Sequence, residues 1–415
     1  MRYELKYDNK TMDIHIDDKN LIGILNANKI QVDLMGDEEV KRALENPIGT
    51  KKLRDIVEPG EKIAIITSDI TRPMPSKKVL PHVLEELNIA GVSKEDIIIV
   101  FALGSHRKHT VDEMKYLVGE DIYNNYKCMD SDIEDYIRLG YTDNNTPIDI
   151  FRPVAKAHRR ICLGNIEFHY FAGYSGGAKA IMPGVSTRKA VEVNHSKMVD
   201  EKAHAGNIDT NPVRLDIEET IKLVPIDFIL NVVLNENKEI IKAVAGHYIH
   251  AHRVGCEFLD ALYKVNLDER ADIVITSIGG YPKDINLYQA QKALDNAKHA
   301  VKDGGIIILV ASCKEGLGED VFEKWILEAE KPEDLINRVK KKFELGGHKA
   351  AAIAMVLEKS RVFLVSEMDE DFVRKIFLEP YNSVQKAYED ALKIIGNNAR
   401  VYLIPNGGSV LPVVL

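Results

Sequence analysis

The chain has 415 residues, of which 45% are hydrophobic and 29% are charged, and its formal net charge is −9. This length exceeds that of one ordinary domain and predicts two, each large enough to bury its own core. Acidic and basic residues are interleaved and leave no basic stripe along the sequence, which argues against nucleic acid as a partner.

The cysteines and the hydrophobic segments indicate the cellular compartment of the protein. Cys128, Cys162, Cys256 and Cys313 are far apart, with neither a CxxC pair nor the spacing of a zinc site, so we expect reduced thiols. Residues 1–18 lack the apolar stretch of a signal peptide, and no segment approaches eighteen uninterrupted apolar residues. The sequence therefore predicts a cytoplasmic protein that does not act at a membrane.

The first predicted elements are a hairpin and a strand followed by a helix. Residues 3–16 alternate apolar and polar side chains around Asp8 and Asn9, which predicts an antiparallel hairpin at the edge of the first sheet. Residues 62–66 form a short apolar run typical of a buried strand. A polar loop then leads to a helix that begins near Ser76, whose hydroxyl can cap it.

Strands and helices continue to alternate after this unit. Residues 97–103 predict a buried strand, and Thr110 with Glu113 forms a capping box at the start of the next helix. Further strands are expected at residues 160–164 and at residues 227–235, the latter turning back as a hairpin. A fresh series begins after residue 270, with predicted strands at 272–277, 306–310, 361–365 and 400–404. This order predicts the α/β class with mainly parallel sheets.

The change of pattern near residue 268 sets the predicted domain boundary. We expect an N-terminal α/β domain over residues 1–268 and a C-terminal α/β domain over residues 269–390. Ligands bind open α/β sheets beyond the carboxyl ends of the strands, so the loops there are where chemistry is sought.

Two loops after predicted strands carry charged or titratable groups. Asp69 and Arg72 follow the first strand, and arginine suits bidentate capture of a carboxylate or phosphate. A turn aspartate beside a solvated arginine would look the same. His106 follows the next strand, where an imidazole can act as a base near neutral pH, although a structural histidine is an equal alternative.

The most informative stretch is residues 167–196. It contains His169, four loop glycines that include Gly176 and Gly177, Lys179 among small apolar residues, and His195. Such glycines let a backbone turn its N–H groups toward an anion, for which a phosphate is the natural guest. A lysine in these surroundings can be desolvated and nucleophilic, or it can extend to solvent. Neither a P-loop nor a dinucleotide fingerprint is present.

A polar helix face is predicted in the second half of the chain. Tyr288, Gln289 and Lys292 follow the loop at residues 279–284, and their spacing brings them to one side of a helix. This face can bind an anion, or it can simply be solvated.

Taken together, these residues resemble the LarA family of nickel-pincer-nucleotide enzymes, whose founding member is lactate racemase. The resemblance covers nearly the whole chain and implies two α/β domains with the active site in the cleft between them. It also implies that residues 1–268 carry the cofactor site and that residues 391–415 return to the N-terminal domain. The matching positions are Asp69, Arg72, His106, His169, Lys179, His195, Tyr288, Gln289 and Lys292.

The resemblance also implies a cofactor, the nickel-pincer nucleotide (pyridinium-3-thioamide-5-thiocarboxylic acid mononucleotide with nickel), and the enzymes that synthesise it as partners. His195 matches the protein ligand of nickel, and Lys179 matches the lysine that can be joined to the cofactor. The other matches to cofactor-binding positions are Asp69, Arg72, Gly176 and Gly177. Matches to substrate-binding positions are Arg72, Tyr288, Gln289 and Lys292, and the division of anions among these residues stays open.

The implied reaction is racemisation of a small 2-hydroxy acid. His106 and His169 match an acid/base pair: one histidine removes the hydroxyl proton as hydride leaves Cα for the cofactor, and hydride return to the other face inverts the centre. Alternatives on the same cofactor are epimerisation of a longer hydroxy acid or of a sugar acid. Alternatives of other classes are a binding protein without turnover, which would need no pair of bases, and a nicotinamide-dependent dehydrogenase, which lacks its fingerprint here.

Overall fold

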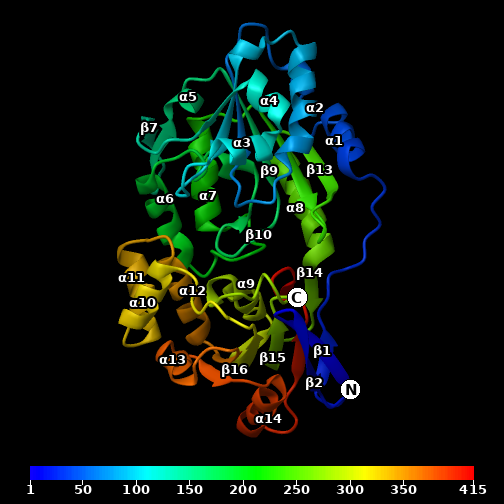
Figure 1. Cartoon of the computed structure of the whole chain (residues 1–415), viewed down its shortest axis with the longest axis vertical. Coiled ribbons are helices and arrows are strands. Elements are labelled where there is room, and N and C mark those ends of the chain that lie inside the picture. The colour runs from blue at the N-terminus through cyan, green and yellow to red at the C-terminus, as the bar shows by residue number, and fades with distance from the viewer. The chain divides into compact units, whose positions relative to one another are not determined.

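The computed structural model describes residues 1–415 and divides them into two compact units. Unit 1 combines Met1–Lys29 with Ala261–Leu415, and unit 2 is Ile30–Asp260. Each unit contains a six-stranded sheet flanked by helices, which confirms the predicted α/β class (Figure 1). No helix in the structure is long and apolar enough to span a bilayer.

Unit 2 is built on a sheet with the strand order β13-β12-β9-β4-β5-β6. All neighbours pair in parallel except β13, which returns antiparallel to β12 as the predicted hairpin. The strands are β4 (Ile63–Ser68), β5 (Ile97–Ala102), β6 (Lys127–Asp130), β9 (Arg159–Asn165), β12 (Phe228–Leu234) and β13 (Ile240–Gly246), with two small pairs, β7 (Tyr136–Tyr141) with β8 (Pro147–Phe151) and β10 (Phe168–His169) with β11 (Gly173–Tyr174). The helices are α1 (Gly36–Glu45), α2 (Ser76–Ile89), α3 (Val111–Val118), α4 (Glu120–Asn125), α5 (Arg152–Ala155), α6 (Arg188–His195) and α7 (Pro212–Glu219), and α8 (His250–Tyr263) begins in this unit.

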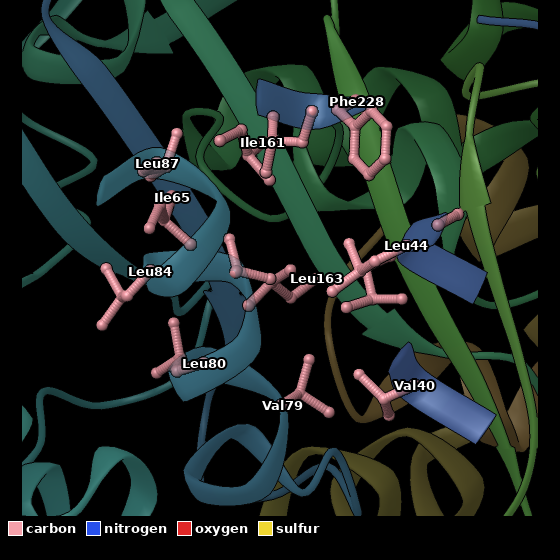
Figure 2. Packing of buried hydrophobic residues seen from close by; sticks show 14 of the residues in the cluster. Val40, Leu44, Ile65, Val79, Leu80, Leu84, Leu87, Ile161, Leu163 and Phe228 are labelled. Carbon is pink, nitrogen blue, oxygen red and sulfur yellow. The ribbon is translucent and has the colours of Figure 1, made fainter. Parts of the chain in front are cut away.

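The main core of unit 2 lies between the sheet and helices α1 and α2. Ile65, Leu163 and Phe228 project from three neighbouring strands, and Leu44 and Leu80 meet them from the helices (Figure 2). The central strands are buried on both faces, which explains why their sequences are continuous apolar runs rather than alternating ones. This packing makes the sheet a rigid support for the loops at its carboxyl edge.

Local capping agrees with the sequence at α3 and differs at α2. Thr110 and Glu113 form the predicted capping box. The helix expected near Ser76 does begin there, but Pro75 is its N-cap residue and no side chain caps it. The Ser76 hydroxyl instead lies 2.7 Å from the Thr67 hydroxyl of β4. Ser76 sits inside the first turn and is buried, so a tertiary hydrogen bond takes the place of the cap.

Unit 1 is built on a parallel sheet with the order β18-β17-β16-β15-β19-β3. Its strands are β3 (Leu21–Ile24), β15 (Ala271–Ser277), β16 (Val301–Val310), β17 (Arg361–Val365), β18 (Glu379–Tyr381) and β19 (Val401–Ile404), with β1 (Arg2–Tyr7) paired to β2 (Lys10–His15) and β14 (Lys264–Leu267) paired to β20 (Leu411–Val414). Its helices are α9 (Leu287–Ala297), α10 (Asp320–Glu328), α11 (Pro332–Lys341), α12 (Gly347–Leu357), α13 (Glu370–Lys375) and α14 (Val384–Ile395).

The N-terminal hairpin forms as predicted, but it does not edge the first sheet. Its apolar side chains, among them Leu5 and Ile14, pack with α14 in the core of unit 1 against β15 and β16. The alternating pattern gives the hairpin one apolar face, and that face is satisfied by covering a sheet rather than by extending one. The pattern alone does not reveal which sheet is covered.

Both ends of the chain therefore belong to the same unit. The prediction placed residues 1–268 in one domain and returned residues 391–415 to it, whereas the structure groups Met1–Lys29 with the later α/β series. The last two strands also stay in unit 1, because β19 pairs with β15 and β20 pairs with β14. Strand pairing over long sequence separations decides this division, and local periodicity does not encode it.

Candidate active site

The candidate residues of unit 2 follow three adjacent strands. β9, β4 and β5 are neighbours in the sheet and run in parallel, so the segments after Asn165, Ser68 and Ala102 leave from the same edge. A short 3-10 helix at Gly177–Ala180 lies against β4 and β9. The amide of Gly104 donates to the carbonyl of Gly184 at 2.9 Å, which ties the glycine-rich loop to the end of β5. The structure thus brings together the three segments that the sequence singled out.

Asp69 and His106 form a hydrogen-bonded pair in this place. Nδ1 of His106 lies 2.5 Å from Oδ2 of Asp69, and the Thr71 hydroxyl donates to Oδ1 of Asp69 at 2.8 Å. Burial alone would raise the pKa of the Asp69 carboxyl, but the hydrogen bond and charge of His106 outweigh it and hold that pKa below its ordinary value. A neutral His106 that donates from Nδ1 carries its lone pair on Nε2, so Nε2 is the nitrogen that can accept a proton.

A second histidine pair fixes the loop that carries Asp69. His109 is buried, its Nδ1 lies 2.6 Å from Oδ1 of Asp130, and its Nε2 accepts from the amide of Ile70 at 3.1 Å. The imidazole therefore connects the end of β6 to the backbone next to Asp69. His106 itself is partly exposed and borders a cavity of about 240 Å³ that Ser131 and Arg188 also line. A small molecule can reach the His106 side chain from there.

The glycine-rich loop is held by buried polar side chains. Gly176 and Gly177 both have positive φ, and the amide of Gly177 donates to Oδ1 of Asn231 at 2.8 Å. Arg214 directs its Nη1 at the carbonyl of Gly176 at 3.3 Å, and Nε2 of His252 lies 2.8 Å from the carbonyl of Ser175. The amide of Gly177 is therefore already engaged, which differs from the expectation that it turns toward a phosphate. It fixes the loop instead.

Lys179 is the basic residue that this loop carries. Desolvation by the surrounding protein, together with the positive charges of Arg72 and Arg214, lowers the pKa of its amine well below the ordinary value. The lowered pKa enlarges the neutral, nucleophilic fraction of the amine. The charge of Arg72 also lowers the pKa of Asp69, so Arg72 acts on both groups, although its own side chain is exposed.

His169 and His195 are linked through an aromatic side chain. The ring of Phe171 makes edge contacts with both imidazoles, at centroid distances of 4.6 Å to His169 and 4.9 Å to His195. Nδ1 of His169 accepts from the amide of Ala172 at 3.2 Å, so a neutral His169 carries its proton on Nε2. Nδ1 of His195 lies 2.8 Å from Oδ1 of Asn194, which places the lone pair of a neutral His195 on Nε2.

The remaining predicted residues lie in unit 1, at the start of α9. Asn286 caps this helix through the amide of Gln289, and Tyr288 and Gln289 are half-buried whereas Lys292 is exposed. Tyr288 also contacts a cation that the sequence did not single out. Nζ of Lys349 lies 4.0 Å from the centroid of the Tyr288 ring and donates to the Tyr288 carbonyl at 2.5 Å.

The donor set of unit 2 fits the cofactor that the resemblance implies. An imidazole nitrogen suits nickel, and Nε2 of His195 carries the lone pair that a metal needs. A lysine amine with a lowered pKa suits covalent attachment, and Lys179 has one. The protein itself offers no cluster of three or more histidine, cysteine or carboxylate side chains arranged for a metal ion. A ligand that brings its own metal donors is compatible with this site.

The chain resembles known proteins over its full length. Residues 7–206 match the family described as Lactate racemase N-terminal domain, and residues 267–412 match Lactate racemase C-terminal domain. A lactate racemase of Thermoanaerobacterium thermosaccharolyticum is 35% identical and one of Lactiplantibacillus plantarum is 34% identical, each over 98% of this chain and at least 98% of the relative.

Solved structures agree with this similarity. The lactate racemase apoprotein from T. thermosaccharolyticum superimposes with a TM-score of 0.89 at 35% sequence identity, covering 99% of this chain and 100% of that one. A Thermotoga maritima protein shares the fold, with a TM-score of 0.64 at 19% identity over 93% of this chain and 100% of that protein.

Fold and site define an α/β enzyme of two domains with mainly parallel sheets, and its relatives identify it as an isomerase of the racemase type. The chain belongs to the LarA family, the family of lactate racemase.

Sequence reasoning did not find the residues that hold the candidate side chains in place. Asn194 directly precedes His195, so a search for polar neighbours of a candidate ligand could have noted it. Arg214, Asp216 and Asn231 carry no such signal, because they reach the site from α7 and β12 and no local spacing relates them to it.

Proposed function

We propose that this protein racemises lactate, or a 2-hydroxy acid of similar size, with a nickel-pincer nucleotide attached at Lys179. The observation that carries the proposal is the meeting of the Asp69–His106 pair with a lysine of lowered pKa at one sheet edge. Similarity over the full length to two curated lactate racemases supports the substrate class. In this proposal the bound cofactor supplies the acceptor and donor of hydride.

His106 takes the hydroxyl proton from one enantiomer. Its Nε2 carries the lone pair, and the Asp69 carboxylate on the other side of the ring stabilises the imidazolium that forms. Loss of that proton and of hydride from Cα leaves a planar 2-oxo acid. The reverse transfers, with hydride added to the opposite face, give the other enantiomer.

His169 serves the other enantiomer, whose hydroxyl occupies a different position. In the observed geometry Nδ1 of His169 accepts from the amide of Ala172, so its Nε2 carries a proton and can donate to the substrate oxygen. Acceptance of a proton at Nε2 requires Nδ1 to release the Ala172 amide and donate elsewhere. We therefore propose that the two histidines are not equivalent before substrate binds.

Cationic and polar side chains hold the substrate carboxylate and the cofactor. We assign Arg72 to an anion because it is exposed next to the Lys179 loop, and arginine offers two parallel donors to a carboxylate. Tyr288, Gln289 and Lys292 remain predicted substrate ligands, and His195 remains the predicted nickel ligand.

The reaction is tested on protein co-expressed with the enzymes that synthesise the cofactor. Each enantiomer of lactate, malate and 2-hydroxybutyrate is incubated separately, and the products are resolved by chiral chromatography. We expect lactate of either hand to approach a racemic mixture. If none of these acids is converted, the proposal is contradicted. If malate alone is converted, the substrate is a larger hydroxy acid than lactate.

Two variants test the residues assigned to chemistry. We expect His106→Ala to lower turnover by about 10²- to 10⁴-fold, the usual effect of losing an acid–base group. His15→Ala, which removes an exposed histidine of the hairpin, is the matched control. Lys179→Ala should abolish the mass increase of the intact chain, while Lys156→Ala, at an exposed lysine of the same unit, should retain it. An unchanged mass increase in Lys179→Ala would exclude Lys179 as the point of attachment.

A further inference from the structure

His195 is in contact with a buried amide whose orientation is fixed. Asn194 is fully buried, and its Oδ1 lies 2.8 Å from Nδ1 of His195. Its Nδ2 donates to the carbonyl of Val213 at 3.1 Å and to Oδ2 of Asp216 at 2.7 Å. Both hydrogens of the amide are therefore engaged on the side away from His195. An amide held in this way can only accept a hydrogen bond from the imidazole.

Asp216 determines which way the Asn194 amide is oriented. The carboxylate is fully buried on α7 and accepts from Thr142 at 2.6 Å, from Thr146 at 2.7 Å and from Lys197 at 3.0 Å, in addition to Asn194. Burial alone would raise the pKa of Asp216, but these donors outweigh it and lower that pKa, so the carboxylate is ionised at neutral pH. An ionised carboxylate only accepts hydrogen bonds. A flipped Asn194 amide would direct its oxygen at this negative charge.

The orientation of the Asn194 amide determines which nitrogen of the His195 imidazole carries the proton. Since Asp216 requires the Nδ2 side of Asn194, Oδ1 is left to face His195, and the imidazole must place a proton on Nδ1 to donate to it. The lone pair of His195 then lies on Nε2. Histidines that bind metal ions commonly have their other nitrogen oriented by a partner of this kind.

We propose that Asp216 and Asn194 are positioning residues that hold His195 in the Nδ1-protonated tautomer and so present Nε2 as a ligand nitrogen. The role of Nε2 as a ligand rests on the proposed function, whereas the control of the tautomer does not. The network joins α6, α7 and the segment between β7 and β8, so its loss also weakens packing. The test therefore needs a measurement that a purely structural role would not change.

The tautomer is read directly from long-range ¹H–¹⁵N spectra of cofactor-free protein labelled at histidine, recorded at one neutral pH. His195→Gln identifies the His195 signals by their loss. We expect the Nδ1-protonated form in the unmodified chain. In Asn194→Leu, which keeps the size of the side chain and removes the acceptor, we expect the Nε2-protonated form to become populated. We expect a smaller change in the same direction in Asp216→Asn.

Thr220→Val is the matched control for lost packing. Thr220 is buried, and its hydroxyl donates to the carbonyl of Ile217 at 2.6 Å, whereas the side-chain donors to Asp216 are Thr142, Thr146, Asn194 and Lys197. This variant should lose stability and keep the Nδ1-protonated tautomer. If Asn194→Leu does not fold, Asp216→Asn and the milder Thr146→Val carry the same comparison.

Nickel content gives the second measurement. After co-expression with the cofactor-synthesising enzymes, we expect Asp216→Asn to bind the nickel cofactor about 10- to 100-fold more weakly than the unmodified chain does. An Nε2-protonated His195 in the unmodified chain, or a tautomer unchanged in every variant, would overturn the inference. If the tautomer responds as expected but the unmodified chain takes up no nickel, the proposed function fails and the positioning by Asn194 and Asp216 stands.

Discussion

The buried Asp69 carboxylate pairs with the imidazole of His106. Thr71 donates to one of its oxygens, and the other lies 2.5 Å from His106, so the buried carboxylate is oriented by its own loop. The sequence predicted Asp69 as a cofactor-binding residue. Its hydrogen bonds support a different use, in which Asp69 sets the tautomer of His106 and stabilises the imidazolium.

This use of Asp69 predicts the effect of a neutral replacement. The amide introduced by Asp69→Asn can present its NH₂ group to Nδ1 of His106, which would move the ring proton to Nε2 and block proton acceptance there. We expect turnover to fall by about 10²-fold or more, within the range that acid–base catalysis supplies.

The measurement is the steady-state rate in both directions of the proposed reaction. Asp121→Asn, at an exposed aspartate of α4, is the control and should keep its rate. A decrease of less than threefold in Asp69→Asn would show that His106 does not depend on this carboxylate.

At the scale of elements, the 3-10 helix at Gly177–Ala180 is held by contacts that only glycine permits. Gly177 has φ +59°, and a Cβ there would lie 3.0 Å from Nη2 of Arg214 and 3.0 Å from the His252 ring. Both neighbours are buried and hold the loop carbonyls, so they cannot move freely. The glycines therefore allow buried side chains to approach the backbone that carries Lys179.

Gly177→Ala tests this close approach. Gly36 is the matched control, because its φ is +58° and no atom lies within 4 Å of the Cβ that alanine would add. Both variants have the left-handed strain of about 1–2 kcal/mol. Only Gly177→Ala should also displace the Lys179 loop, with a larger loss of stability and of the mass increase at Lys179. Equal losses in thermal unfolding experiments on the two variants would contradict this account.

At the scale of the whole molecule, the free energy of unfolding depends on the protonation state of Lys179. The amine has a lowered pKa in the folded chain and its ordinary value when unfolded, so unfolding takes up a proton between these two values. The free energy of unfolding should therefore rise with pH across that window, by up to about 1.4 kcal/mol per pH unit from this group. The penalty disappears once the pH passes the ordinary lysine value.

Lys179→Met removes the buried amine and should flatten this rise. Chemical denaturation between pH 7 and pH 10 measures the slope, and we expect the variant to gain stability over the unmodified chain at pH 7. Lys156→Met, at an exposed lysine of unit 2, should keep the original slope. An identical slope in Lys179→Met and the unmodified chain would show that the amine is not desolvated.

The sequence by itself determined the features that depend on neighbouring residues. Apolar runs predicted the central strands, Thr110 and Glu113 predicted a capping box, and the candidate residues were found because they follow strands. These signals are local: the period of a strand, the cap of a helix and the end of a strand are each contained in a short window.

Only the tertiary structure decided which distant groups meet. It placed the N-terminal hairpin in unit 1 and brought Arg214 to the backbone of the loop that carries Lys179. It also connected His195 through Asn194 to Asp216. The physical reason is that a buried polar group must find partners wherever packing brings them, over any sequence separation. The residues available for chemistry can be predicted from the sequence, and their protonation and orientation follow from the fold.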